Sequence, residues 1–229
     1  MLIVIMCIVM LPILCLGNSA QPPSILIIVE HPPKDLEIRL EENGGFLEAD
    51  VIDKGFEKYY TFYSRELKVY GNRLQVATAG KTTLLDVSGP LKKYENIFTL
   101  DTEKMSLIPG KLLSRSIILI LLRLVLTILI EAPIFFLFGF TERRSWIVFF
   151  IANFVTQGIL NVFLNGLSPV TSYLIFPLVF GEIFVFIGEL ILFNIFTDEQ
   201  SGARIFSYVV TANAVSLILG SYIIEYLPV

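Results

Sequence analysis

Cysteine, histidine and charge are scarce in this 229-residue sequence. Its two cysteines, Cys7 and Cys15, lie within the first 20 residues, so the remaining chain has no thiol for a disulfide, a thiolate nucleophile or a cysteine-ligated metal. The single histidine, His31, lies outside every long apolar segment, which excludes a membrane-embedded zinc-protease motif. The sequence also lacks a Gly-x-Ser-x-Gly motif, a Walker loop and a dinucleotide fingerprint. We therefore expect a protein that is not an enzyme and that needs no cofactor.

The low charge content also excludes an entirely soluble globule. Charged residues make up 17% of the chain, whereas soluble domains carry ~25%. Hydrophobic residues make up 55%, which is too many for a disordered protein. The net charge of −4 and the pI near 5.1 argue against nucleic acid as the main partner. These averages are typical of a membrane protein with a soluble part.

The first 20 residues predict a secretory signal peptide. An apolar run is followed by the small residues Gly17, Ser19 and Ala20, which favours cleavage after Ala20. No Lys or Arg precedes the run, so an uncleaved anchor helix is the alternative. An apolar run of ~17 residues is short for a membrane span, which favours cleavage.

The remaining chain consists of two halves with different composition. Residues 21–110 hold 14 acidic and 11 basic side chains, whereas residues 111–229 hold 7 and 6. The boundary falls near Pro109-Gly110. In the first half, β-branched and aromatic runs alternate with Gly, Pro and Asn breakers, which indicates seven short strands and a small β-sandwich or open barrel. The expected strands are Ser24–Glu30, Asp35–Leu40, Tyr59–Tyr63, Glu66–Tyr70, Leu74–Ala77, Thr82–Val87 and Ile97–Leu100.

The second half contains four apolar segments, each long enough to span a membrane: residues 116–138, 146–164, 172–196 and 205–226. We therefore predict an α+β membrane protein, with an extracytoplasmic β-domain followed by a four-helix transmembrane bundle in the lipid bilayer. Export of residues 21–110 would put the C-terminus outside and loops 139–145 and 197–204 in the cytoplasm. Those two loops carry Arg143, Arg144 and Arg204, as the positive-inside rule requires, although Lys111 and Arg115 fall on the outer flank.

Each expected span carries one polar residue at a matching depth. Counted at ~1.5 Å per residue, these side chains lie ~10–12 Å from the cytoplasmic boundary. They are Glu131, Asn153, Glu189 and Asn213. Ionisable groups in hydrocarbon are costly and usually face the interior of a bundle. We expect one polar layer to which all four helices contribute.

A second set of polar residues lies nearer the outer side. Arg123 and Glu182 fall at similar depths and are expected to form an intramembrane ion pair. Gln157 and Asn161 continue the stripe that starts at Asn153, because residues four apart share one helix face. Glu182 and Glu189 each follow a glycine, and Gly181 and Gly188 would let a neighbouring helix approach closely.

The charges of these residues leave three interpretations open. Arg123 can compensate one carboxylate, which leaves Glu131 and Glu189 at one depth without a counterion. Such a pair would share a proton or hold a cation, to which Asn153 and Asn213 could add oxygen ligands. The same groups could instead hold the helices together by hydrogen bonds, or form a contact surface for another membrane subunit. We could not identify a metal from the sequence.

The overall plan resembles that of uncharacterised bacterial polytopic membrane proteins with an exported β-domain. The resemblance covers the whole chain and lies in Gln21-Pro-Pro-Ser-Ile25, Asn153-Phe-Val-Thr-Gln157 and the two Gly-Glu pairs. It implies no particular activity. We expect the β-domain to dock or sense a partner and the helices to anchor or assemble a membrane complex, with a protein partner or a second copy of the chain. The alternative function is a small proton- or cation-coupled permease.

Overall fold

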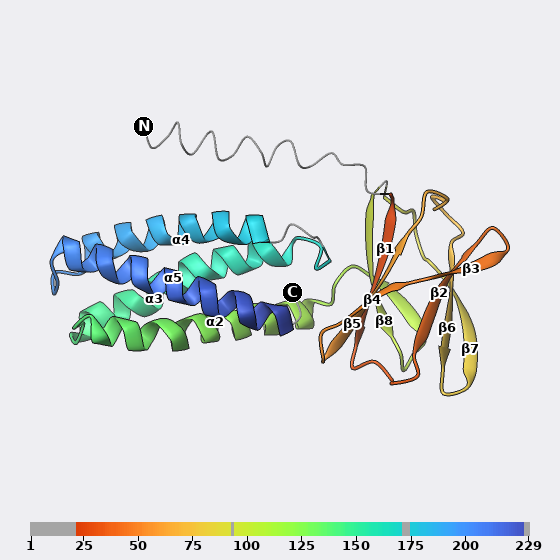
Figure 1. Cartoon of the computed structure of the whole chain (residues 1–229), viewed down its shortest axis with the longest axis horizontal. Coiled ribbons are helices and arrows are strands. Elements are labelled where there is room, and N and C mark those ends of the chain that lie inside the picture. The colour runs from red at the N-terminus through yellow and green to blue at the C-terminus, as the bar shows by residue number, and fades with distance from the viewer. Residues whose placement is uncertain (1–21, 93, 171–174, 227–229) are drawn as a thin grey trace. The chain divides into compact units, whose positions relative to one another are not determined.

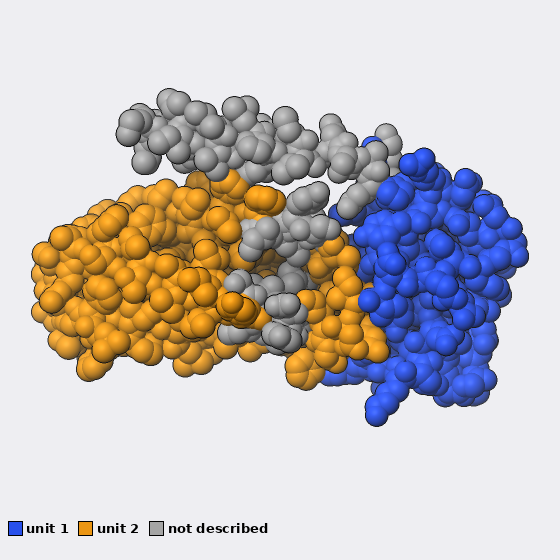
Figure 2. Space-filling view, viewed as in Figure 1, with its two compact units in different colours: residues 1–51, 60–110 blue, residues 52–59, 111–229 orange. Residues whose placement is uncertain are grey.

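The computed structural model describes residues 22–92, 94–170 and 175–226, so the predicted signal peptide, residues 1–20, lies outside it. The chain divides into two compact units (Figure 2). Unit 1 contains the described residues up to Val51 together with Tyr60–Gly110. Unit 2 contains Ile52–Tyr59 and the chain from Lys111 onward.

Two β-sheets are followed in sequence by four long helices, which is an α+β arrangement (Figure 1). The described residues form nine strands: β1 Ser24–Glu30, β2 Glu37–Glu42, β3 Gly45–Glu48, β4 Asp50–Asp53, β5 Glu57–Tyr63, β6 Arg73–Thr78, β7 Lys81–Asp86, β8 Glu95–Asp101 and β9 Ser106–Pro109. One sheet has the order β4-β5-β1-β8-β9 and the other β3-β2-β6-β7. Strand β1 pairs in parallel with β8, and the second sheet is antiparallel throughout.

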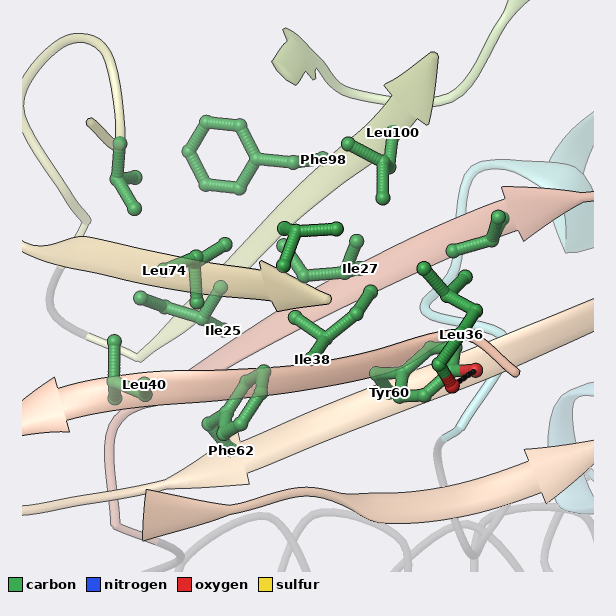
Figure 3. Close-up of a cluster of buried hydrophobic side chains, with 13 residues drawn as sticks. Ile25, Ile27, Leu36, Ile38, Leu40, Tyr60, Phe62, Leu74, Phe98 and Leu100 are labelled. Atoms are coloured by element: carbon green, nitrogen blue, oxygen red, sulfur yellow. Dashed lines mark hydrogen bonds between the residues drawn. The ribbon is translucent and has the colours of Figure 1, made fainter. Parts of the chain in front are cut away.

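Alternating side chains from both sheets form the core of unit 1 (Figure 3). Ile25, Ile27 and Val29 of β1 are buried together with Leu74 and Val76 of β6. The hydroxyl of Tyr60, which belongs to the same core, donates a hydrogen bond to the Leu36 carbonyl oxygen at 3.2 Å. Strand β6 alternates buried and less buried positions with period 2, whereas β1 is buried at nearly every position.

Tight turns set the register of the two hairpins in the second sheet. Asn43 and Gly44, between β2 and β3, both have positive φ, at 49° and 80°. Ala79 and Gly80, between β6 and β7, have φ of 50° and 71°. Two successive residues with positive φ give the turn whose twist matches paired strands, and glycine adopts this conformation without strain.

One predicted strand is wrong and three strands were not predicted. Residues 66–70 form turns, because polar side chains bind the backbone locally and replace a strand ladder. The Asn72 side chain bonds both the N–H and the carbonyl of Lys68, at 3.1 and 2.6 Å, and the Ser64 hydroxyl accepts from the N–H of Glu66 at 2.9 Å. Strands β3, β4 and β9 are four residues long, too short for a clear alternation pattern.

The four helices lie close to the predicted spans: α2 Leu113–Leu137, α3 Arg143–Asn165, α4 Ile175–Phe196 and α5 Gly202–Tyr226. Within the described residues, these four are long and apolar enough to cross a membrane. Many of their apolar side chains remain exposed, including Ile118 at 64%, Leu129 at 63% and Ile159 at 67%. Such surfaces are stable in lipid and would be unfavourable in water, which supports a multi-pass membrane protein.

The α2–α3 and α4–α5 loops are held together by hydrogen bonds. Glu199 accepts from the backbone N–H groups of Thr141 and Glu142 at 2.6 and 3.0 Å, which places a carboxylate at the first turn of α3. Arg144 and Asp198 form an exposed ion pair at 2.8 Å. These contacts fix one end of the bundle.

The unit 1 core can be tested with two leucines on neighbouring strands. Leu74 of β6 is fully buried, whereas Leu84 of β7 is 52% exposed. We expect Leu74→Ala to lower the free energy of unfolding of unit 1 by ~2–5 kcal/mol. Leu84→Ala should change it by less than ~0.5 kcal/mol. Urea titration of the full-length protein, followed by amide exchange in β1 and β6, measures both; equal losses would show that Leu74 is not in the core.

Candidate functional site

Four polar side chains, one from each helix, are buried in the interior of the bundle. Glu131 of α2, Asn153 of α3 and Glu189 of α4 have no exposed surface, and Asn213 of α5 is 6% exposed. The helices place these groups inside because the opposite faces of the same helices are apolar and exposed. The described residues thus contain an acidic layer built by all four helices.

Glu189 links three of these helices. The Asn213 side-chain amide donates to Glu189 Oε2 at 2.7 Å, which joins α5 to α4. Thr156 Oγ1 of α3 lies 3.3 Å from Glu189 Oε1, although it is closer to its own Ala152 carbonyl oxygen, at 2.8 Å. The Glu189 carboxyl therefore has a polar neighbour on each oxygen. This is the arrangement expected of a side chain that holds helices together.

Glu131 differs from Glu189. Within the part of the chain that the structure describes, neither of its oxygens has a hydrogen-bond partner. The Asn153 and Ser216 side chains lie near its carboxyl group but do not meet hydrogen-bond geometry, and the carboxyls of Glu189 and Glu182 add like-charge repulsion. A buried ionised carboxylate in this position would be strongly destabilised.

Aromatic rings close the bundle on the side of the loops. We call them the aromatic cluster; all are fully buried, and they are Phe135, Phe140, Phe149, Phe193 and Tyr208. The centroid of Phe135 lies 4.2 Å from that of Phe140, 4.8 Å from Phe149 and 5.0 Å from Tyr208. Phe135 and Phe193 each follow a layer carboxylate by four residues, so the cluster lies one helical turn closer to the loops.

A pocket with a cavity volume of about 50 Å³ lies among the four helices on the other side of the layer. We call it the polar pocket, because charged, amide and hydroxyl groups interrupt its apolar wall. Its polar lining residues are Arg123, Thr127, Gln157, Asn161, Glu182 and Ser216. Ser216 belongs to both regions, since it lines the pocket and also lies near the Glu131 carboxyl.

The pocket brings the second predicted set of residues together. Asn161 donates to the Gln157 carbonyl oxygen at 2.8 Å, and Gln157 Nε2 lies 3.5 Å from Glu182 Oε2, at the limit of a hydrogen bond. Arg123 and Glu182 share the pocket wall. Among the described residues no ion pair within 4.0 Å joins these two side chains, so the predicted pair is a shared location rather than a direct contact.

The sequence analysis missed a buried charge pair, which lies within unit 2. Arg115 binds both carboxylate oxygens of Glu57, at 2.7 and 2.8 Å, and the Tyr59 hydroxyl at 3.0 Å. The side chains of Arg115 and Glu57 are only 2% and 6% exposed. Arg115 was expected on the outer flank of a span, but the structure shows it inside the protein. Its partner lies 58 positions away, and no local pattern indicates such a contact.

Lys111 lies next to the start of α2 and contacts the end of α3. Its ammonium group donates to the carbonyl oxygens of Asn165 and Leu167, both at 2.7 Å. Burial, together with the positive charges of Arg115 and Arg123, lowers the pKa of Lys111 to about 8. The contact ties α2 to α3 at the end opposite to the aromatic cluster.

No protein-family model matches the chain, and the search of curated proteins finds no relative. Among the described residues, no group of three His, Cys, Asp or Glu side chains is arranged to hold a metal ion. The site must therefore be interpreted from its own geometry.

The two glycines of α4 lie where α3 packs against it. A Cβ on Gly181 would overlap Leu160 Cδ1, and one on Gly188 would lie 3.2 Å from Thr156 Cγ2. Gly158 on α3 has no neighbour within 4 Å of such an atom. Glycines on α4 therefore allow this close contact with α3. Gly158 on α3 is a matched control because it has no such contact.

We expect Gly181→Ala to weaken the α3–α4 contact, because Leu160 must move to make room. Gly158→Ala should be neutral or stabilising by up to ~1 kcal/mol, since alanine favours helix over glycine. Thermal unfolding in detergent compares the two variants. Equal effects would show that Gly181 is not at a close helix contact.

Proposed function

We propose that the helical bundle is the membrane part of a small proton-linked permease, in which Glu131 takes up and releases a proton. The observation that supports this function is the Glu131 carboxyl group, which is fully buried with no hydrogen-bond partner on either oxygen among the described residues. A group used only to hold helices together would be bonded, as Glu189 is to Asn213. The difference between the two carboxylates favours a titrating role for Glu131.

A count of hydrogen-bonding groups favours a proton as the missing component. Around Glu131, the described acceptor atoms without a partner are its two carboxyl oxygens and the Oδ1 atoms of Asn153 and Asn213. Two hydroxyl groups in the same region, those of Tyr208 and Ser216, can donate. Protonating Glu131 turns one acceptor into a donor. The protonated carboxyl can donate to an unpaired oxygen such as Asn153 Oδ1, which the ionised carboxylate cannot do.

Neighbouring charges also favour a neutral Glu131. The acidic groups that act on it are Glu189 and Glu182, both on α4. The nearest cation on the pocket wall, Arg123, shares that wall with Glu182. Two adjacent carboxylates in an apolar interior cannot both be charged without a counterion. Release of the proton from Glu131 therefore requires a change in its surroundings, which is the property of a coupled carrier.

Removal of the titratable group tests this function. We expect Glu131→Gln to abolish proton flux into liposomes driven by an imposed potential, while the protein keeps its fold, because glutamine has similar size but cannot release a proton. Glu189→Gln should reduce both flux and thermal stability, since the amide replaces an oxygen that accepts from Asn213 or lies beside Thr156.

Glu142→Gln is the matched control, because Glu142 is exposed in the α2–α3 loop. Its flux should equal that of the wild-type protein. Normal flux in Glu131→Gln, or no flux in the folded wild-type protein, would refute the permease function.

We also propose that residues 21–110 and the C-terminus lie outside the cell and that loops 139–145 and 197–204 lie in the cytoplasm. The arginines of these loops support this orientation. Residues 21–229 contain no cysteine, so single introduced cysteines can report the side. In intact spheroplasts, an impermeant maleimide should label Ser88→Cys but label Ala203→Cys only after permeabilisation. The reverse pattern would invert the topology.

The docking or sensing role expected for residues 21–110 stays a prediction. It is supported by the separate hydrophobic core of unit 1, which needs no helix residue to be complete. A domain with its own core can bind a partner while the helices remain in the membrane. Because four helices are few for a complete permease, we expect the chain to act as a homo-oligomer.

A further inference from the structure

Building on the function proposed above, we propose that Glu131 exchanges its proton only with the polar pocket, by way of Ser216. The aromatic cluster closes the route toward the α2–α3 and α4–α5 loops. The structure thus has a pocket with polar groups on one side of Glu131 and packed aromatic rings on the other. The route consists of the polar pocket, Ser216 of α5 and Glu131 of α2.

The pocket lies in the half of the bundle that contains the first part of α2. Its lining begins at Arg123, ten residues after the helix starts at Leu113, and reaches Gly220 near the end of α5. Thr127 and Ile130 bring the lining to within one helical turn of Glu131. A cavity volume of about 50 Å³, with charged, amide and hydroxyl groups among its apolar lining residues, has room for a few water molecules.

Ser216 connects this pocket to the buried carboxylate. It is 5% exposed, it lines the pocket, and its hydroxyl lies near the Glu131 carboxyl without forming a hydrogen bond to it. A hydroxyl group can accept a hydrogen bond from one neighbour while it donates to another. Ser216 is therefore the polar group through which a proton could pass between the pocket and Glu131, once its hydroxyl and the carboxyl come within hydrogen-bond distance.

The opposite route is blocked by close ring packing. The rings of Phe135 and Phe140 are stacked with an interplanar angle of 4°, and Tyr208 lies edge-on to both, at 5.0 and 5.4 Å. All three side chains are fully buried. Packed rings offer a proton neither water nor a polar path, apart from the Tyr208 hydroxyl, which has no hydrogen-bond partner among the described residues. Movement of these rings would be needed to open the loop side.

Two residues one turn apart on α5 provide a direct test. Ser216 lines the pocket, and Ala212, four residues earlier, is fully buried against the aromatic cluster. Each is replaced by cysteine in the full-length protein, and the reactivity is measured with a charged, impermeant methanethiosulfonate added to one side at a time. The wild-type protein corrects for Cys7 and Cys15. Thr127→Cys provides a second pocket position if Ser216→Cys does not fold.

We expect Ser216→Cys or Thr127→Cys to react at least tenfold faster from the side labelled through Ser88→Cys than from the other side. Ala212→Cys should remain unreactive from both sides. Adding Phe140→Ala should make Ala212→Cys reactive from the loop side, because it removes a ring that lies outside the helices.

Unreactive pocket cysteines, or an Ala212→Cys that reacts from the loop side with the cluster intact, would overturn this route. Those results leave the proton-linked function standing if Glu131→Gln still abolishes flux. Reactive pocket cysteines together with normal flux in Glu131→Gln would instead reject the function and leave the pocket as a solvent-accessible site.

Discussion

The cost of placing a carboxylate charge inside an apolar bundle governs the arrangement of this protein's helices. Each buried polar group must find a partner, give up its charge or face a cavity. Glu189 has found partners, because α5 presents Asn213 to one of its oxygens. Glu182 faces the polar pocket. Glu131 has no hydrogen-bond partner in the described structure, and the nearby carboxyls of Glu189 and Glu182 disfavour its charged form.

The packing of the helices around this layer explains why the unpartnered carboxyl group is confined to the position of Glu131. Glycines let α4 approach α3, so that Gly181 contacts Leu160 and Gly188 contacts Thr156. On the loop side, the aromatic rings pack against one another and are fully buried; on the other side, mixed polar and apolar residues leave a pocket. Filled and open volumes on opposite sides of one titratable group make the bundle asymmetric along its axis. An asymmetry of this kind is what directional transport requires.

The sequence indicated the architecture well and the pair contacts poorly. Hydropathy and charge content located all four helices to within a few residues, and Gly and Asn breakers located the hairpin turns, because these signals are local. The strand predicted at residues 66–70 failed because Asn72 bonds the Lys68 backbone, a contact between specific atoms that propensity does not encode. Depth counting grouped Glu131 with Glu189, but it could not show that only Glu189 is hydrogen-bonded. Ser216, Thr156 and Tyr208 were missed, since a single hydroxyl in an apolar segment usually bonds its own helix.

Comparison with the other charges of unit 2 shows how unusual Glu131 is. Arg115 is buried as deeply as many core residues, and its Nε and Nη2 atoms bind Glu57 and Tyr59. Lys111 is partly buried and donates to two carbonyl oxygens at the end of α3. The fold can therefore supply precise partners for buried charges, from residues that are far apart in sequence. The lack of a hydrogen-bond partner for Glu131 among the described residues is therefore the observation that supports the proposed proton-carrying role.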